Sequence, residues 1–82
     1  MKNKYILASL ASDLKRVALG LHRGSNAMAE KFLQESLKRK EEVDMKSVAP
    51  YVKKLLQNLN SKIDADRALM YGTLFQNYSQ RI

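Results

Sequence analysis

Apolar residues in the first quarter of the chain recur at steps of three and four. This spacing is kept by Leu7, Leu10, Leu14, Val17 and Leu21. Because an α-helix turns once in about 3.6 residues, the spacing places all five on one side of a helix. The 82 residues include only three glycines and one proline, and the few β-branched residues do not alternate with polar ones. The sequence therefore predicts an all-α fold.

The first break in the helical pattern is expected at residues 23–25. Gly24 is suited to the left-handed conformation that ends many helices, and Ser25 and Asn26 can cap the helix that follows. The pattern extends this second helix over about residues 26–42. Its expected buried residues are Ala29, Phe32, Leu33 and Leu37.

A third helix is predicted to begin at Ser47, with Asp44 as the competing cap. Pro50 then falls in the first turn, where its missing N–H leaves no hydrogen bond unmade. The expected inward residues of this helix are Val48, Val52, Leu55, Leu56 and Leu59.

The boundary between the third and fourth helices allows two interpretations. In the first, residues 58–61 form a turn, and Ser61 and Asp64 have the spacing of a capping box that starts a fourth helix. Short connections then favour a small four-helix up-down bundle with one domain over residues 1–82. In the alternative, residues 47–79 form one long helix, and the fold has three helices.

The last helical segment has an apolar surface about 160° wide, which is more than contact with a single core requires. Tyr71, Phe75 and Tyr78 lie on this surface. The helix either lies in a groove between two others, or its aromatic residues contact a partner, since aromatic residues are enriched in interface cores. The second interpretation gives the main hypothesis, which is a non-enzymatic interaction module that forms a homo-oligomer or binds another protein.

The charge balance supports an alternative hypothesis. Lys and Arg number 15 against 8 Asp and Glu, giving a formal net charge of +7. Arg16 and Arg23 share the outward face of the first helix, and Lys53 and Lys54 share that of the third. If these faces are adjacent, the four cations can contact phosphates, as in a sequence-independent RNA- or DNA-binding protein. Tyr5, projecting opposite the core stripe, is the one aromatic residue near these cations.

The composition gives no support to most catalytic and metal sites. Without cysteine the chain has no disulfide and no thiolate zinc site, and the single histidine, His22, has no carboxylate within a helical turn. We therefore expect no metal and no cofactor. No stretch reaches the roughly 18 to 20 apolar residues of a membrane span, and the apolar run after Lys4 is too short for a signal peptide. The expected location is the cytoplasm.

Arg16 and His22 enclose five residues within the segment 16–22. This spacing resembles the motif of arginine, four to six residues and histidine in HEPN ribonucleases, which are helical bundles that often act as dimers. Val17 stands where the family usually has a polar residue. The resemblance implies that Arg16 holds a phosphate and that His22 acts as a general acid or base. A ribonuclease is the third hypothesis.

Overall fold

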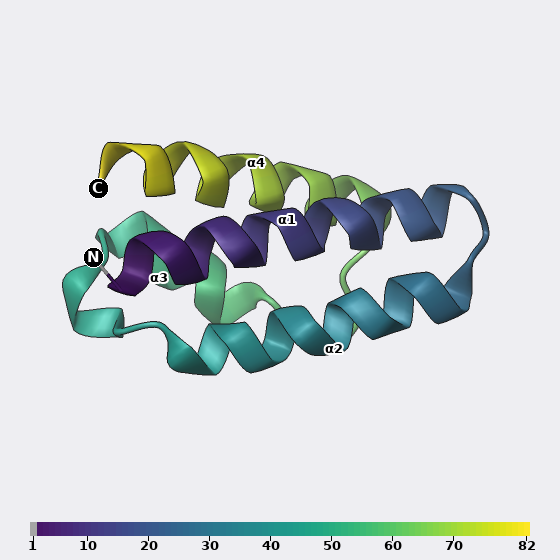
Figure 1. Ribbon diagram of the computed structural model, residues 1–82, viewed down its shortest axis with the longest axis horizontal. Coiled ribbons are helices and arrows are strands. Elements are labelled where there is room, and N and C mark those ends of the chain that lie inside the picture. The colour runs from purple at the N-terminus through teal and green to yellow at the C-terminus, as the bar shows by residue number, and fades with distance from the viewer. Residues whose placement is uncertain (1) are drawn as a thin grey trace.

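Four α-helices and one short 3-10 turn form the regular structure of this chain. The structure is a computed structural model that describes residues 2–82, within which no strand occurs. The helices are α1 (Lys2–His22), α2 (Asn26–Glu42), α3 (Pro50–Asn58) and α4 (Ala65–Arg81). Consecutive helices run in opposite directions (Figure 1). The prediction of an all-α, four-helix up-down bundle is therefore confirmed.

The connection between α1 and α2 is a tight glycine turn, as predicted. Gly24 has φ = 72°, and it is the only described residue with a positive φ. The Ser25 N–H donates to the Gly20 carbonyl at 2.8 Å, which satisfies one of the carbonyls that the end of α1 leaves free. Ser25 occupies the N-cap position of α2, but its side chain makes no capping hydrogen bond.

The start of the third helix differs from the prediction. Ser47 does not cap α3, because it belongs to the 3-10 turn Met45–Ser47 and its hydroxyl donates to Asp44 Oδ2 at 2.8 Å. Asp44 caps that turn instead, accepting a hydrogen bond from the Lys46 N–H. α3 begins only at Pro50, with Ala49 at the N-cap. Pro50 thus lies in the first turn, as expected.

α3 and α4 are separate helices, so the alternative of one long helix over residues 47–79 is wrong. The backbone leaves the helical conformation at Leu59, which is extended and buried. The Leu59 carbonyl accepts a hydrogen bond from Lys40 Nζ at 2.8 Å. This contact with α2 satisfies a carbonyl at the end of α3. The capping box at Ser61 is not formed, because Asp64 itself caps α4 and accepts from the Arg67 N–H at 2.7 Å.

The core lies along α1, which packs against both α2 and α4. Of the predicted stripe, the first four residues are buried and Leu21 is half-buried. Both neighbouring helices approach closely at a glycine. A Cβ added to Gly20 would lie 2.8 Å from Ala29 N of α2, and one added to Gly72 would lie 3.1 Å from Ala11 O of α1.

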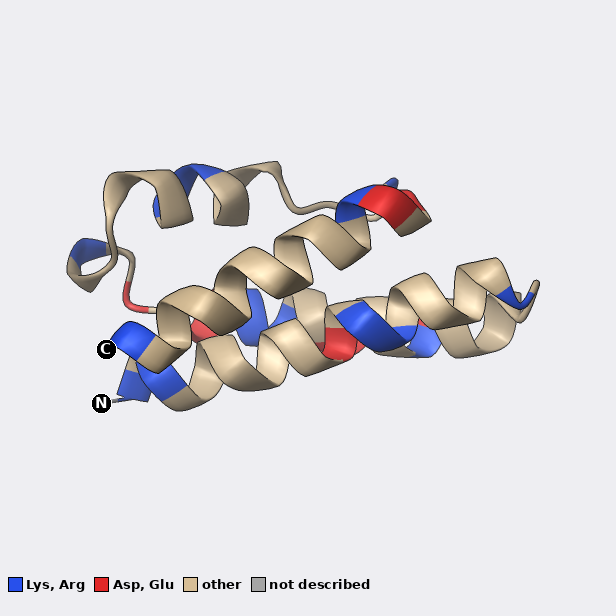
Figure 2. Ribbon diagram, turned by 90° about the horizontal axis from the view of Figure 1, so that it is seen from above, with Lys and Arg blue, Asp and Glu red and all other residues tan. Residues whose placement is uncertain are grey.

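α3 is much shorter than the other helices and covers only part of the bundle. It has nine residues, whereas α2 and α4 have 17 each. Seen from above, the hairpin of α1 and α2 extends well beyond α3 (Figure 2). The inward residues of α3 and the chain after it, Val52, Leu56 and Leu59, are buried as predicted.

Candidate functional site

The three aromatic residues of α4 proposed as an interface are used within the single chain. Phe75 is 0% exposed and Tyr71 8% exposed, and their rings meet edge to face with centroids 6.3 Å apart. Tyr78 is half-buried. Its hydroxyl accepts a hydrogen bond from the Ala49 N–H at 3.0 Å, and its ring meets that of Tyr51. Tyr71 and Phe75 therefore expose almost no surface, as expected if the last helix packs within the chain.

The close approach of α4 to α1 at Gly72 accounts for this burial. Gly72, which follows Tyr71 directly, is buried against α1. The inward face of α4 is consequently centred between Tyr71, Gly72 and Phe75. Leu69 and Met70 lie outside this inward face and are 48% and 51% exposed.

The four cations proposed to contact phosphates do not form one site. Arg16 is exposed on α1 and Arg23 in the turn that follows it, and Lys53 and Lys54 are exposed on α3, as expected for outward positions. However, α1 and α3 lie on opposite sides of the bundle in Figure 2. The two basic faces therefore cannot contact the same short stretch of a ligand.

A buried carboxylate, which sequence reasoning missed, lies between α1 and α2. Asp13 is the only acidic residue of α1, and it accepts a hydrogen bond from Arg39 Nε at 2.9 Å. Arg16 Nη1 lies 3.9 Å from the same carboxylate, and the Arg16 guanidinium lies 5.2 Å from the centroid of the Phe32 ring. Because Asp13 is buried and paired, it places no free negative charge on the outward face of α1.

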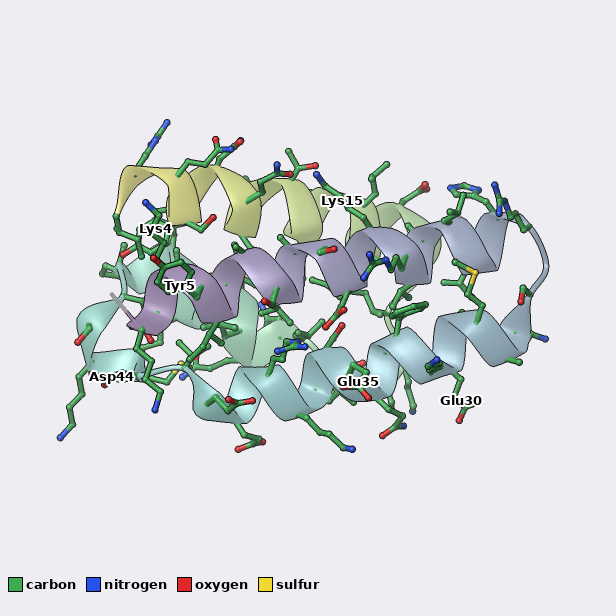
Figure 3. The ribbon with its side chains drawn as sticks, in the orientation of Figure 1. Lys4, Tyr5, Lys15, Glu30, Glu35 and Asp44 are labelled. Carbon is green, nitrogen blue, oxygen red and sulfur yellow. The ribbon has the colours of Figure 1, made fainter. Side chains whose placement is uncertain are left out.

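A groove between α1 and α4 carries two half-buried lysines and one exposed tyrosine. Its volume is about 400 Å³. The lining consists of basic, small and amide side chains together with one tyrosine, namely Lys4, Tyr5, Ala8, Ala11, Ser12, Lys15, Gln76, Ser79 and Gln80. No carboxylate is among them. Figure 3 shows Lys4 and Lys15 on the side of α1 that faces α4, with Tyr5 beside Lys4. We call this surface the α1–α4 groove.

A contact between Lys15 and Gln76 in the α1–α4 groove was not predicted from the sequence. Lys15 Nζ donates to Gln76 Oε1, which links α1 to α4 across 61 positions of sequence. Gln76 carries no charge, so the contact orients the ammonium without neutralising it. Tyr5, which sequence reasoning did single out, is 70% exposed. No local signal predicts that Lys15 and Gln76 meet, since their contact depends on how α4 is rotated.

The charges of the bundle are unevenly distributed. α1 and α4 together carry six Lys and Arg against two Asp, whereas α2 carries four Lys and Arg against four Glu. In Figure 3, Glu30 and Glu35 of α2 lie on the side of the bundle away from Lys4 and Lys15. The α1–α4 groove is therefore a part of the surface where positive charge exceeds negative charge.

A second groove lies where α3 fails to cover α1 and α2. It has a volume of about 380 Å³ and lies beside residues 61–63. Its lining combines apolar and polar side chains, namely Val17, Leu21, Asn26, Ala29, Glu30, Leu33, Gln34, Ser61 and Ile63. It contains one carboxylate and no Lys or Arg, so it has no chemistry suited to phosphate.

Arg16 and His22 do not converge on a common point. Both belong to the continuous helix α1, where six residues correspond to about 120° of rotation and a rise of about 9 Å. Arg16 is directed toward Asp13 and Phe32, and His22 is exposed at the helix end. Within residues 2–82, no group of three His, Cys, Asp or Glu side chains is arranged to bind a metal ion. No described helix is long and apolar enough to cross a membrane.

Comparison of the chain with protein-family models, with curated proteins and with solved structures gives no match.

Proposed function

We propose that this protein binds nucleic acid, without sequence preference, through the outward face of α1 and the α1–α4 groove. The observation that carries the proposal is Tyr5, a 70% exposed aromatic residue on a basic helix face that bears no free carboxylate. Exposed aromatic rings beside Lys and Arg are the combination that sequence-tolerant binders use to hold bases and phosphates together. The activity is non-enzymatic and belongs in the cytoplasm.

The residues of this surface extend the cationic face that the sequence suggested. Lys4 and Lys15 lie eleven residues apart, which corresponds to about 20° of rotation and about 16 Å along α1. They therefore form a line beside α4. Arg16 lies about 100° around α1 from Lys15, and Arg23 lies in the turn that follows α1; both are exposed. Lys53 and Lys54 belong to a different side of the bundle, where they contribute only long-range attraction.

A binding titration at several salt concentrations tests the proposal. Affinity for a fluorescently labelled oligonucleotide, measured by anisotropy, should fall steeply between about 50 and 200 mM salt, because bound cations displace counterions from the phosphates. The double variant Lys4→Gln/Lys15→Gln should reduce the salt slope by about 1 to 2. The matched control is Lys31→Gln/Lys38→Gln, which removes the same charge from exposed positions of α2.

Two results would contradict the proposal. One is the absence of binding at about 50 mM salt, where electrostatic contacts are strongest. The other is an equal loss of affinity in the α2 control and the groove variant, since this would show dependence on net charge alone. Recovery of intact RNA after incubation with the wild-type protein would also exclude the ribonuclease hypothesis.

A second candidate function is self-association through α4, as the sequence suggested, but through different residues. Leu69 and Met70 are adjacent on the outward side of α4 and about half exposed. In a two-fold symmetric dimer, this face of α4 would contact the same face of a second copy. A chain of this size buries only a limited share of its surface when it folds as a monomer, so association would bury more apolar surface.

Sedimentation velocity tests this second candidate. Met70→Lys should shift the protein toward monomer, whereas Leu19→Lys, at an exposed apolar position of α1, should leave the oligomeric state unchanged. A wild-type protein that sediments as a monomer would exclude the dimer.

A further inference from the structure

We infer that the α1–α4 groove is selective for unpaired nucleotides, with the ring of Tyr5 as the stacking surface for a base and the ammonium of Lys15 as a phosphate contact. This inference rests on the proposed nucleic-acid binding and specifies its substrate class. It follows from the environment of Tyr5, from the way Lys15 is held, and from the shape of the surface between them.

Tyr5 differs from every other aromatic residue that the structure describes. Tyr71 pairs with Phe75, and Tyr51 pairs with Tyr78. The Phe32 ring is covered by two cations of the same chain. Within residues 2–82, only the ring of Tyr5 has no such contact, and it is the most exposed large hydrophobic side chain. Such a ring has no packing role and is free to stack on a ligand.

The residues that follow Tyr5 on the same helix face are small. Ala8 and Ser12 lie three and seven positions further along α1, which places them one and two turns from the ring. Both are exposed. Because neither side chain is long enough to cover the ring, a flat group can approach it from the groove.

Lys15 is held in place at the other end of the groove. Its stem is half-buried, and its ammonium donates to the side-chain oxygen of Gln76. Within the described residues, the only ion pairs are those of Asp13 with Arg16 and Arg39. The charge of Lys15 therefore remains uncompensated. An ammonium already ordered by a neutral partner loses less entropy when it contacts a phosphate.

The positions of these groups match a strand of a few nucleotides. Lys4 adjoins Tyr5, and Lys15 lies ten residues from Tyr5, about 15 Å along the helix. Lys4 and Lys15 are both rotated from Tyr5 by about 80 to 100° in the same direction around the helix, so the phosphate contacts lie along one side of the ring. The groove volume of about 400 Å³ falls within the range of small-ligand pockets. A duplex cannot use the ring, because its bases are stacked on one another and unavailable.

Matched single-stranded and duplex oligonucleotides test this inference. Anisotropy titrations with a labelled single strand and with the same strand annealed to its complement should be made for the wild type, Tyr5→Ala, Tyr5→Phe and Lys15→Gln. Tyr5→Ala should weaken single-strand binding by about 5- to 150-fold, the equivalent of losing one base stack. Duplex binding should change by less than about twofold, because only phosphate contacts remain. Tyr5→Phe should retain single-strand affinity, and Lys15→Gln should weaken both forms equally.

The outcomes separate this inference from the proposed function. If Tyr5→Ala leaves single-strand binding unchanged, or weakens both forms equally, the selectivity is refuted while nucleic-acid binding stands. If the wild type binds neither form at about 50 mM salt, both proposals fail. Helical circular dichroism and the melting temperature of each variant should match the wild type, because Tyr5 and Lys15 lie outside the core.

Discussion

Truncation of Phe75 tests whether α4 forms core or interface. Phe75 is fully buried and its ring meets that of Tyr71. Replacing a buried Phe by Ala costs about 3 to 5 kcal/mol through lost burial and cavity formation. At roughly 0.05 to 0.15 kcal/mol per residue, a chain of 82 residues has a stability of about 4 to 12 kcal/mol. Phe75→Ala therefore removes a large part of the total, and it unfolds the chain if the total is near the lower value.

The variant Phe75→Leu keeps the experiment informative in that case. It retains a branched apolar side chain and loses the ring contact with part of the buried volume, for a cost of about 1 to 2 kcal/mol. Urea unfolding followed by circular dichroism measures this loss as a lower midpoint with an unchanged slope. The loss should be the same at two protein concentrations about a hundredfold apart, because folding of a core residue does not depend on association.

Two controls belong to this experiment. Leu14→Ala, in the core of α1, should lose about 2 to 5 kcal/mol at both concentrations. Leu69→Ala, at an exposed position of α4, should change stability by no more than about 0.5 kcal/mol in a monomer. If the loss in Phe75→Leu depends on concentration while that in Leu14→Ala does not, Phe75 lies in a subunit interface, and our placement of α4 is wrong.

Three further variants test individual contacts by urea unfolding. Gly20→Ala should lower stability by up to about 2 kcal/mol, because a Cβ 2.8 Å from the backbone of α2 costs more than the helix gains from Ala; an increase would contradict the close approach. Asp13→Asn should cost about 1 to 2 kcal/mol by weakening the contact with Arg39, and a coupling near zero in a double-mutant cycle with Arg39→Gln would exclude it. Asn3→Ala should cost about 1 to 3 kcal/mol by removing two hydrogen bonds to the backbone of Asp44, and an Asp44 amide that exchanges no faster than before would contradict this role.

The parts of the fold that depend on local sequence were predicted correctly. The core stripe of α1 and the glycine turn at Gly24 follow from spacing and from one permissive residue. The start of α3, which was predicted at Ser47, was wrong because it depends in part on a distant contact. Ser47 is held in a turn by Asp44, and Asn3 of α1 binds the backbone of Asp44. A contact between residues 41 positions apart cannot be found in a window of a dozen residues.

The candidate site was less predictable than the fold, because it depends on the rotation of one helix. Outward positions on each helix can be found from periodicity, and Tyr5 was identified in this way. Which outward faces become neighbours is decided by packing. Because Gly72 has no side chain, the backbone of α1 lies close to α4 at this position. In this arrangement Gln76 of α4 faces Lys15 of α1. Tyr71 is buried beside Gly72, whereas the sequence alone left open both burial within the chain and contact with a partner.

The separation of charge across the bundle makes the α1–α4 groove more favourable to an anion than the net charge indicates. The bundle is about 20 Å thick across its two shorter axes. This thickness is about two Debye lengths at 0.1 M salt, so charges on opposite sides are largely screened from one another. The four glutamates lie on α2, which also carries four Lys and Arg, so the formal net charge of this helix is zero. A phosphate in the groove therefore experiences the cations of α1 and α4 with little opposition, since Asp13 is paired with Arg39. Neutralising Asp13 should consequently affect stability more than nucleic-acid affinity.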